Sequence, residues 1–188
     1  ENHGCILIKD ASANKGGVTS SSMEVLASLA LNDHDFVGKF IGSDKSSRSE
    51  LYAAYVIEVQ KRIEHNAKEE FKQLWTLHQS SGTPISELSN VLSQTINKVN
   101  DDLINSTELW LNDLTLRNYL LLNKIIPKLL VDVAGSEKIL ENIPITYLKA
   151  LLSSFLSSSF VYKFGIDVNI AKFLEFIGEL KREAEKAY

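Results

Sequence analysis

The chain has 188 residues, 44% of them hydrophobic, so it is long enough to bury one substantial core. Its formal net charge of −4 carries no long block of like charge, which excludes the basic face that duplex nucleic acid requires. No apolar run approaches the roughly 18 residues of a membrane span and the start lacks a signal-peptide pattern, so we expect a soluble, intracellular protein.

Cysteine and histidine usage excludes two further classes. Cys5 is the only cysteine, which rules out a disulfide framework within the chain and fits a reducing compartment. The four histidines lack the spacing of paired metal ligands, so we expect no metal site.

The numbering opens on Glu1 and the only methionine, Met23, lies inside a patterned segment. We therefore expect a segment of a longer protein.

The first 31 residues predict the edge of an α/β layer. Residues 5–8 form a short apolar run, and a polar loop containing two glycines follows at residues 11–17, as is typical of a buried strand that feeds a loop. Beyond the loop, five apolar residues share one helical face. They are Met23, Leu26, Ala27, Ala30 and Leu31. A strand, a loop and a helix are expected in this order.

Residues 49–78 predict one long amphipathic helix. Its apolar stripe comprises Tyr52, Tyr55, Val56, Val59, Ile63, Phe71, Leu74 and Trp75. Its expected solvated side comprises Lys61, Arg62, Glu64, Lys68, Glu69 and Glu70. Gly82 ends this helix and Pro84 opens the next, whose stripe runs from Ile85 to Leu103 with alternating spacings of three and four. The two helices should pack antiparallel.

The remaining chain also reads as helical. A segment that is apolar nearly all round, from Trp110 to Val133, should be the most buried, with a kink or restart at Pro127. Pro144 opens another apolar helix that Gly165 ends. A last helix is expected over residues 168–187. Its inward residues should be Ile170, Phe173, Leu174, Ile177 and Leu180.

The stretch with chemical content is residues 14–21, Asn-Lys-Gly-Gly-Val-Thr-Ser-Ser. Paired glycines between a strand and a helix let backbone approach a ligand, and a helix start offers free amide donors to an anion. By composition alone the signal is weak. An equally simple interpretation is a tight turn in which Thr19 or Ser20 caps the helix.

The order of the letters is more specific than their composition. The stretch resembles the glutamate dehydrogenase signature Ala-Asn-x-Gly-Gly-Val-Thr-x-Ser-x-x-Glu. The matching positions are Ala13, Asn14, Gly16, Gly17, Val18, Thr19, Ser21 and Glu24. With Lys-Asp-Ala-Ser ahead at residues 9–12 and a serine triplet at 20–22, it resembles the large fungal NAD-specific enzyme. Residues 101–103, 109–114, 117–122 and 169–178 resemble the tail of that enzyme, so the resemblance covers essentially the whole chain.

The resemblance implies oxidative deamination of L-glutamate to 2-oxoglutarate and ammonia, with hydride passing to NAD. It places Asn14 beside the nicotinamide, and Val18 and Ser21 in the pocket for the glutamate side chain. These residue types suit those roles, because valine can pack a methylene chain and a hydroxyl can donate to a carboxylate. Lys15 departs from the small residue often found there. It is either a surface residue or a second cation near the carboxylate.

The implied organisation has two parts. Residues 1–44 would end the α/β dinucleotide-binding domain, and residues 45–188 would form a helical C-terminal tail. The chain has no GxGxxG fingerprint and nothing that resembles the catalytic lysine segments, so we assign no catalytic residue and expect this chain alone to be inactive. The resemblance also implies a homo-oligomer in the cytoplasm or the mitochondrion.

A second hypothesis belongs to a different class of protein. The long apolar stripes could serve a helical interaction or oligomerisation module without a catalytic role, in which the Gly-Gly stretch is only a turn. A dinucleotide fingerprint elsewhere in the intact protein would favour the enzyme, whereas an unrelated module would favour this alternative.

Overall fold

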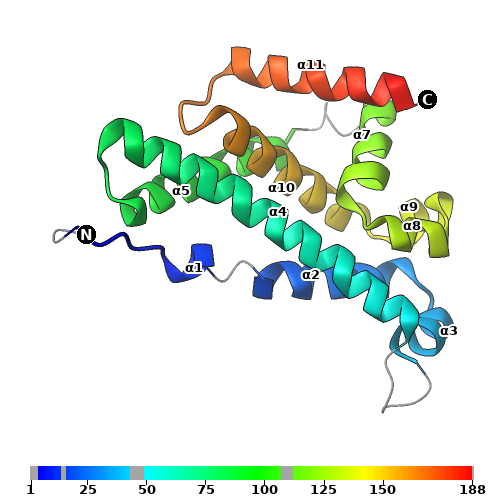
Figure 1. Ribbon diagram of the computed structural model, residues 1–188. Helices are drawn as coiled ribbons and strands as arrows, with labels where there is room; N and C mark the ends of the chain where they lie inside the picture. Colours follow the sequence, from blue (N-terminus) through cyan, green and yellow to red (C-terminus); the bar gives the residue numbers. More distant parts are fainter. Residues whose placement is uncertain (1–3, 14–15, 43–48, 107–111, 188) are drawn as a thin grey trace.

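A computed structural model of the chain describes residues 4–13, 16–42, 49–106 and 112–187. Within these ranges the chain is mostly α-helical, as expected, and contains no strand. Helices α4, α5 and α10 cross the middle of the molecule, with α2 along one side and α11 along the opposite side (Figure 1). The buried apolar residues of these helices form a single core.

The strand expected at residues 5–8 is not formed in this structure. Residues 5–9 have no regular secondary structure, and the side chains of Ile6, Leu7 and Ile8 are each about half exposed. A strand requires a neighbouring strand to satisfy its backbone groups, and the described ranges supply none. The expected edge of an α/β layer is therefore absent from the described residues, and the apolar side chains of residues 6–8 are partly exposed to solvent.

Helix α2, Gly16–Ala30, follows the short helix α1, Asp10–Ala13. The buried face predicted for α2 is confirmed, since all five predicted inward residues are buried. Its start differs from the tight-turn interpretation: Thr19 and Ser20 lie inside the helix and do not cap it. The Ser20 hydroxyl donates to the carbonyl of Gly17 at 3.1 Å, a bond within the helix.

A short helix and a π-helix follow α2. The side chain of Asn32 caps α3, Asp33–Asp35, by accepting from the backbone amide of Asp35. The π-helix η1, Phe36–Ile41, then carries Phe40 into the core against two tyrosine rings of α4. The expected domain boundary at residues 44 and 45 lies outside the described residues.

The predicted long helix is α4, Glu50–Ser81, which Ser49 caps and which Gly82 ends in the left-handed conformation with φ of 68°. Helix α5, Ile85–Ile104, begins directly after Pro84, and the chain reverses direction between the two helices (Figure 1). The helical hairpin expected from the two stripes is confirmed.

Two positions on α4 differ from the predicted faces. Phe71, expected in the apolar stripe, is nearly half exposed. Glu70, expected on the solvated side, is buried and accepts a hydrogen bond from the hydroxyl of Tyr162 at 2.9 Å. A buried carboxylate needs such a donor, and this donor comes from a helix 92 residues further along the chain.

The described part of the apolar segment around residue 120 is broken into three short helices. Helix α7, Leu114–Leu120, passes into the π-helix η2, Leu121–Ile125, and the chain restarts after Pro127 as α8, Lys128–Ala134. Pro127 is therefore the predicted restart. Helix α9, Ser136–Asn142, follows Gly135. Trp110, where the segment was expected to begin, lies outside the described residues.

The last two long helices are α10, Ile145–Phe164, and α11, Ile170–Ala187. Gly165 ends α10 as predicted, with φ of 79°. The inward face predicted for α11 was partly wrong, because Ile170 and Leu174 are 72% and 64% exposed. Its buried face is instead formed by Phe176, Leu180 and Ala184, with Phe173 and Ile177 packed at the edge. No described helix is long and apolar enough to span a bilayer.

Candidate functional site

Helix α2 brings two of the three predicted site residues onto one exposed strip. Val18 is 78% exposed, and Ser21 and Val25, three and seven positions further on, are exposed as well. Spacings of three and four place them on one side of the helix, opposite the buried side that includes Met23 and Leu26. The third predicted residue, Asn14, and its neighbour Lys15 lie outside the described residues.

The hydroxyl of Ser21 differs from those of Ser20 and Ser28 on the same helix. Ser20 and Ser28 donate to carbonyls of their own helix, at 3.1 and 2.8 Å. Among the described residues, no hydrogen-bond partner engages the hydroxyl of Ser21. It is therefore available to a ligand that approaches the exposed strip.

The segment before residue 14 is attached to helix α5. The hydroxyls of Ser12 and Ser89 lie 2.8 Å apart, and the ammonium of Lys9 donates to the side-chain oxygen of Asn90. On the other side of the motif, a Cβ added to Gly16 would meet only the Cδ1 atom of Ile63, at an ordinary 3.9 Å. Packing against the tail therefore does not require a glycine at position 16.

Two tyrosine hydroxyls hold α2 from its buried side. Tyr55 of α4 donates to the carbonyl of Met23 at 2.6 Å, and Tyr147 of α10 donates to the carbonyl of Ser22 at 3.0 Å. The accepting carbonyls belong to the two residues that follow Ser21. The site helix is thus fixed to the helical tail directly behind the residue predicted to bind substrate.

Burial raises the pKa of Tyr55 and, to a smaller extent, that of Tyr147. Both phenols are protonated near neutral pH even at their ordinary pKa, and the shift keeps them hydrogen-bond donors at higher pH. Burial also lowers the pKa of Arg62, an effect that the carboxylate of Glu58 opposes. Arg62 remains a cation at physiological pH.

Sequence reasoning placed Tyr55 in the apolar stripe and assigned no role to Tyr147. A buried tyrosine usually has a hydrogen-bond partner for its hydroxyl, so the place of Tyr55 in the apolar stripe indicated that such a partner exists. The partner itself could not be read from the sequence, because it is a backbone carbonyl that lies 32 residues away for Tyr55 and 125 residues away for Tyr147.

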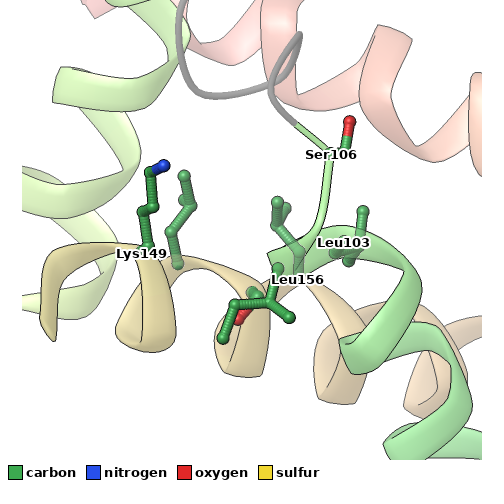
Figure 2. A pocket seen from close by; sticks show the side chains of 7 residues that line it. Leu103, Ser106, Lys149 and Leu156 are labelled. Atoms are coloured by element: carbon green, nitrogen blue, oxygen red, sulfur yellow. The ribbon is translucent and has the colours of Figure 1, made fainter. Parts of the chain in front are cut away.

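Neither of two hollows elsewhere on the described surface is lined by a residue of α2. The smaller lies between the end of α5 and α10, where Leu103, Lys149 and Leu156 line it (Figure 2). Its volume of about 10 Å³ holds roughly one water molecule. The larger, of about 370 Å³, lies beside Glu58 and Arg62, whose charged groups already bond to backbone.

Nothing in the described ranges gathers three metal-ligating side chains of histidine, cysteine, aspartate or glutamate. The cluster Asp33-His34-Asp35 instead forms the start of a helix, with Asp35 paired to Lys39 at 2.7 Å. The ammonium of Lys39 lowers the pKa of Asp35.

Comparison with known proteins gives the class first. Residues 1–82 match the family described as Glutamate/Leucine/Phenylalanine/Valine dehydrogenase. The matched part contains the whole Gly-Gly motif and the exposed strip of α2, and it ends at Gly82, the residue that terminates α4. This part of the chain therefore resembles a family of amino-acid dehydrogenases.

Nearly the whole chain is homologous to a segment of NAD-specific glutamate dehydrogenases. It is 74% identical over 185 residues to that enzyme of Saccharomyces cerevisiae, in an alignment covering 98% of this chain and 17% of the relative. The Neurospora crassa enzyme is 44% identical over 179 residues, in an alignment that covers 95% of this chain and 17% of the relative. Glutamate dehydrogenase 2 of Dictyostelium discoideum is 44% identical over 183 residues, covering 97% and 17%.

The chain thus spans about 17% of the length of these relatives. No solved structure matches it. The resemblance carried by the motif is confirmed as homology, and this homology extends through the helical tail.

Proposed function

We propose that this chain is part of an NAD-specific glutamate dehydrogenase, which deaminates L-glutamate oxidatively to 2-oxoglutarate and ammonia with hydride transfer to NAD. The observation that carries the proposal is the exposed strip of α2. It presents Val18 and the unengaged hydroxyl of Ser21 side by side, within a motif matched by the dehydrogenase family.

The two side chains suit the two halves of a glutamate side chain. The isopropyl group of Val18, largely uncovered here, can bury against the methylene carbons. The hydroxyl of Ser21, one helical turn further on, can donate to the terminal carboxylate. Because packing leaves room for a Cβ at Gly16, the glycine there is explained by close approach of a ligand to the backbone.

NAD is the proposed hydride acceptor, but the described residues do not form a cradle for it. They contain no parallel sheet, and the chain has no GxGxxG fingerprint. We propose Asn14 as the residue of this chain that lies beside the nicotinamide, on the basis of the motif alone. We assign no catalytic residue here and expect the chain by itself to be inactive.

The domain organisation is also a proposal. Residues 1–44 would complete the dinucleotide-binding domain, with residues 5–8 as a buried strand, and residues 45–188 would form the helical tail. Three half-exposed apolar side chains in residues 6–8 support a strand that pairs within the intact enzyme. The family match continues through α4 to residue 82, so α4 lies both in the matched region and in the proposed tail, residues 45–188. From the resemblance we further propose a homo-oligomer in the cytoplasm or the mitochondrion.

Replacement of Ser21 by alanine in the intact enzyme tests the substrate site. Loss of a hydrogen bond to a charged group is worth about 1.5–3 kcal/mol, or roughly a ten- to hundred-fold fall in kcat/KM for glutamate. The preference for glutamate over norvaline, which lacks the side-chain carboxylate, should fall as well. The matched control is Ser20→Ala, because its hydroxyl is engaged with Gly17. An unchanged preference in Ser21→Ala would refute the assignment.

A second substitution separates the two ends of the motif. Asn14→Ala should act through the nicotinamide, changing kcat or the apparent NAD affinity more than the preference between amino acids. If Asn14→Ala instead alters only the preference for glutamate over norvaline, Asn14 belongs to the substrate side of the cleft.

A further inference from the structure

The two carbonyls that follow Ser21 each accept a hydrogen bond from outside their helix. In an α-helix a carbonyl already accepts from the amide four residues on, and its second lone pair can take another donor. At Ser22 and Met23 these donors are the hydroxyls of Tyr147 and Tyr55, at 3.0 and 2.6 Å. The backbone next to the predicted carboxylate ligand is therefore fixed from behind.

The two donors belong to different parts of the helical tail. Tyr55 lies on α4 and Tyr147 at the start of α10, 92 positions apart. A single tether would allow α2 to rotate or slide about one point, whereas two tethers on adjacent carbonyls restrict both motions. The sulfur of Met23 also contacts the guanidinium of Arg62 at 3.7 Å, on the same buried side.

Burial makes the Tyr55 bond difficult to replace. Its side chain is 3% exposed and its ring packs edge-on against Phe40, so water cannot substitute for the carbonyl of Met23 without repacking. Tyr147 is only half-buried. Its bond to Ser22 is longer by 0.4 Å, from 3.0 and 2.6 Å, and should contribute less.

We propose that Tyr55 and Tyr147 are positioning residues for substrate selection: through the carbonyls of Met23 and Ser22 they hold α2 at the rotation and depth that bring the Ser21 hydroxyl to the side-chain carboxylate. This inference rests on the proposed function of Ser21. It adds a role for the helical tail, which contributes to the choice of amino acid without contacting it.

The test uses the intact enzyme with Tyr55→Phe and Tyr147→Phe, since phenylalanine keeps the ring and removes only the hydroxyl. Each variant should lower kcat/KM for glutamate by about two- to ten-fold, the effect of one neutral hydrogen bond, with the larger loss in Tyr55→Phe. The efficiency with norvaline should change less, so the preference between the two substrates should fall. The apparent KM for NAD should stay within about two-fold of the parent value.

Tyr162→Phe is the matched control for destabilisation. It removes a partly buried phenolic hydroxyl from the same tail, but its partner is Glu70, not α2. This variant should lower the melting temperature while leaving the preference for glutamate over norvaline unchanged. A parallel fall in preference would show that general loosening of the tail, and not the tethers, controls selection.

Double variants distinguish failure of this inference from failure of the proposed function. If the tyrosines act through Ser21, then adding Tyr55→Phe to Ser21→Ala should not lower the preference further. If Ser21→Ala reduces the preference and neither tyrosine variant does, the positioning role is refuted and the proposed function stands. If Ser21→Ala itself leaves the preference unchanged, both fail. Should Tyr55→Phe not fold, the half-buried Tyr147→Phe gives the same decision.

Discussion

Glu58 and Arg62, one helical turn apart on α4, secure the two sides of the break before α8. The carboxylate of Glu58 accepts from the backbone amides of Lys128 and Leu129 at 2.6 and 3.2 Å, which are free because a helix begins there. The guanidinium of Arg62 donates to the last carbonyls of η2, at residues 124 and 125. The two side chains thus replace backbone bonds that the break removes.

Arg62→Met should therefore lower the free energy of unfolding of the 188-residue chain by about 1.5–3 kcal/mol, because it leaves the carbonyls of residues 124 and 125 without a charged donor. Methionine preserves most of the packing volume. Urea unfolding followed by circular dichroism measures the loss. Lys61→Met, at the exposed neighbouring position, should have little effect. Equal losses in the two variants would show that Arg62 acts only by packing.

Leu92→Asp should destabilise the chain by several kcal/mol, roughly 3 or more, since it would bury an unpaired carboxylate at a position that is 1% exposed. The adjacent Val91 is 40% exposed, so Val91→Asp should change the free energy of unfolding by less than about 1 kcal/mol. Thermal melts of the two variants give the comparison. Similar melting temperatures would contradict the assigned faces of α5.

Leu7→Asp separates this chain from the intact enzyme. In the 188-residue chain the side chain is 52% exposed, so the free energy of unfolding should change by less than about 0.5 kcal/mol. In the intact enzyme, a buried strand at residues 5–8 would make the same change costly, by about 2 kcal/mol or more. Thermal inactivation of the intact enzyme provides the second measurement. A harmless Leu7→Asp there would refute the proposed strand.

The ion pair between Asp113 and Lys181 predicts a pH dependence. Lys181 lies 2.9 Å away and lowers the pKa of Asp113, as does the amide of Leu116 that Asp113 caps. A lowered folded-state pKa gives stability that is present above about pH 4, the ordinary aspartate value, and is lost as the pH falls through the folded value.

Asp113→Asn keeps the cap and removes the charge. Because both partners of the ion pair are partly exposed and solvent screens the pair, the variant should lose only about 0.2–1 kcal/mol at pH 7. The difference from the parent should shrink as the pH falls below about 4 and through the lowered folded-state pKa of Asp113, because protonation removes the charge that asparagine lacks. Urea unfolding at several pH values measures it. A loss that does not diminish as the pH falls would show that it does not come from the charge of Asp113.

Helix ends were the part of the fold that sequence described best, because local chemistry determines them. Gly82 and Gly165 end helices in backbone conformations that favour glycine, and Pro127 lacks the amide that continuation requires. These signals act within a few residues. They need no knowledge of the rest of the chain.

Side-chain burial was predicted less well where it depends on distant partners. Arg62 and Glu70 are charged and were expected in solvent, yet their partners are carbonyls and a phenol more than 60 residues away. Conversely, Ile170 and Leu174 are apolar but lie outside the face that α11 presents to the core. Periodicity identifies a stripe, and only the neighbouring helices decide which edge of the stripe is covered.

For the candidate site, the motif supplied Val18 and Ser21 but not the geometry behind them. Their shared face follows from a spacing of three on a helix. The tethers from Tyr55 and Tyr147 end on backbone carbonyls, which carry no residue identity and leave no trace in the sequence. The strand expected at residues 5–8 was inferred from its own composition, whereas pairing depends on a neighbour.

The 15 residues of α2 form two faces with different roles. One side is a core face of the tail, and the other is the exposed strip. If a ligand binds the exposed strip only when α2 is packed against the tail, ligand binding and this packing are thermodynamically linked. The ligand then stabilises the packed state by the same free energy that the packing contributes to ligand binding. Mutations in the buried part of the tail and ligands on the exposed strip therefore shift the same equilibrium, the packing of α2 against the tail. They act on opposite faces of this one helix.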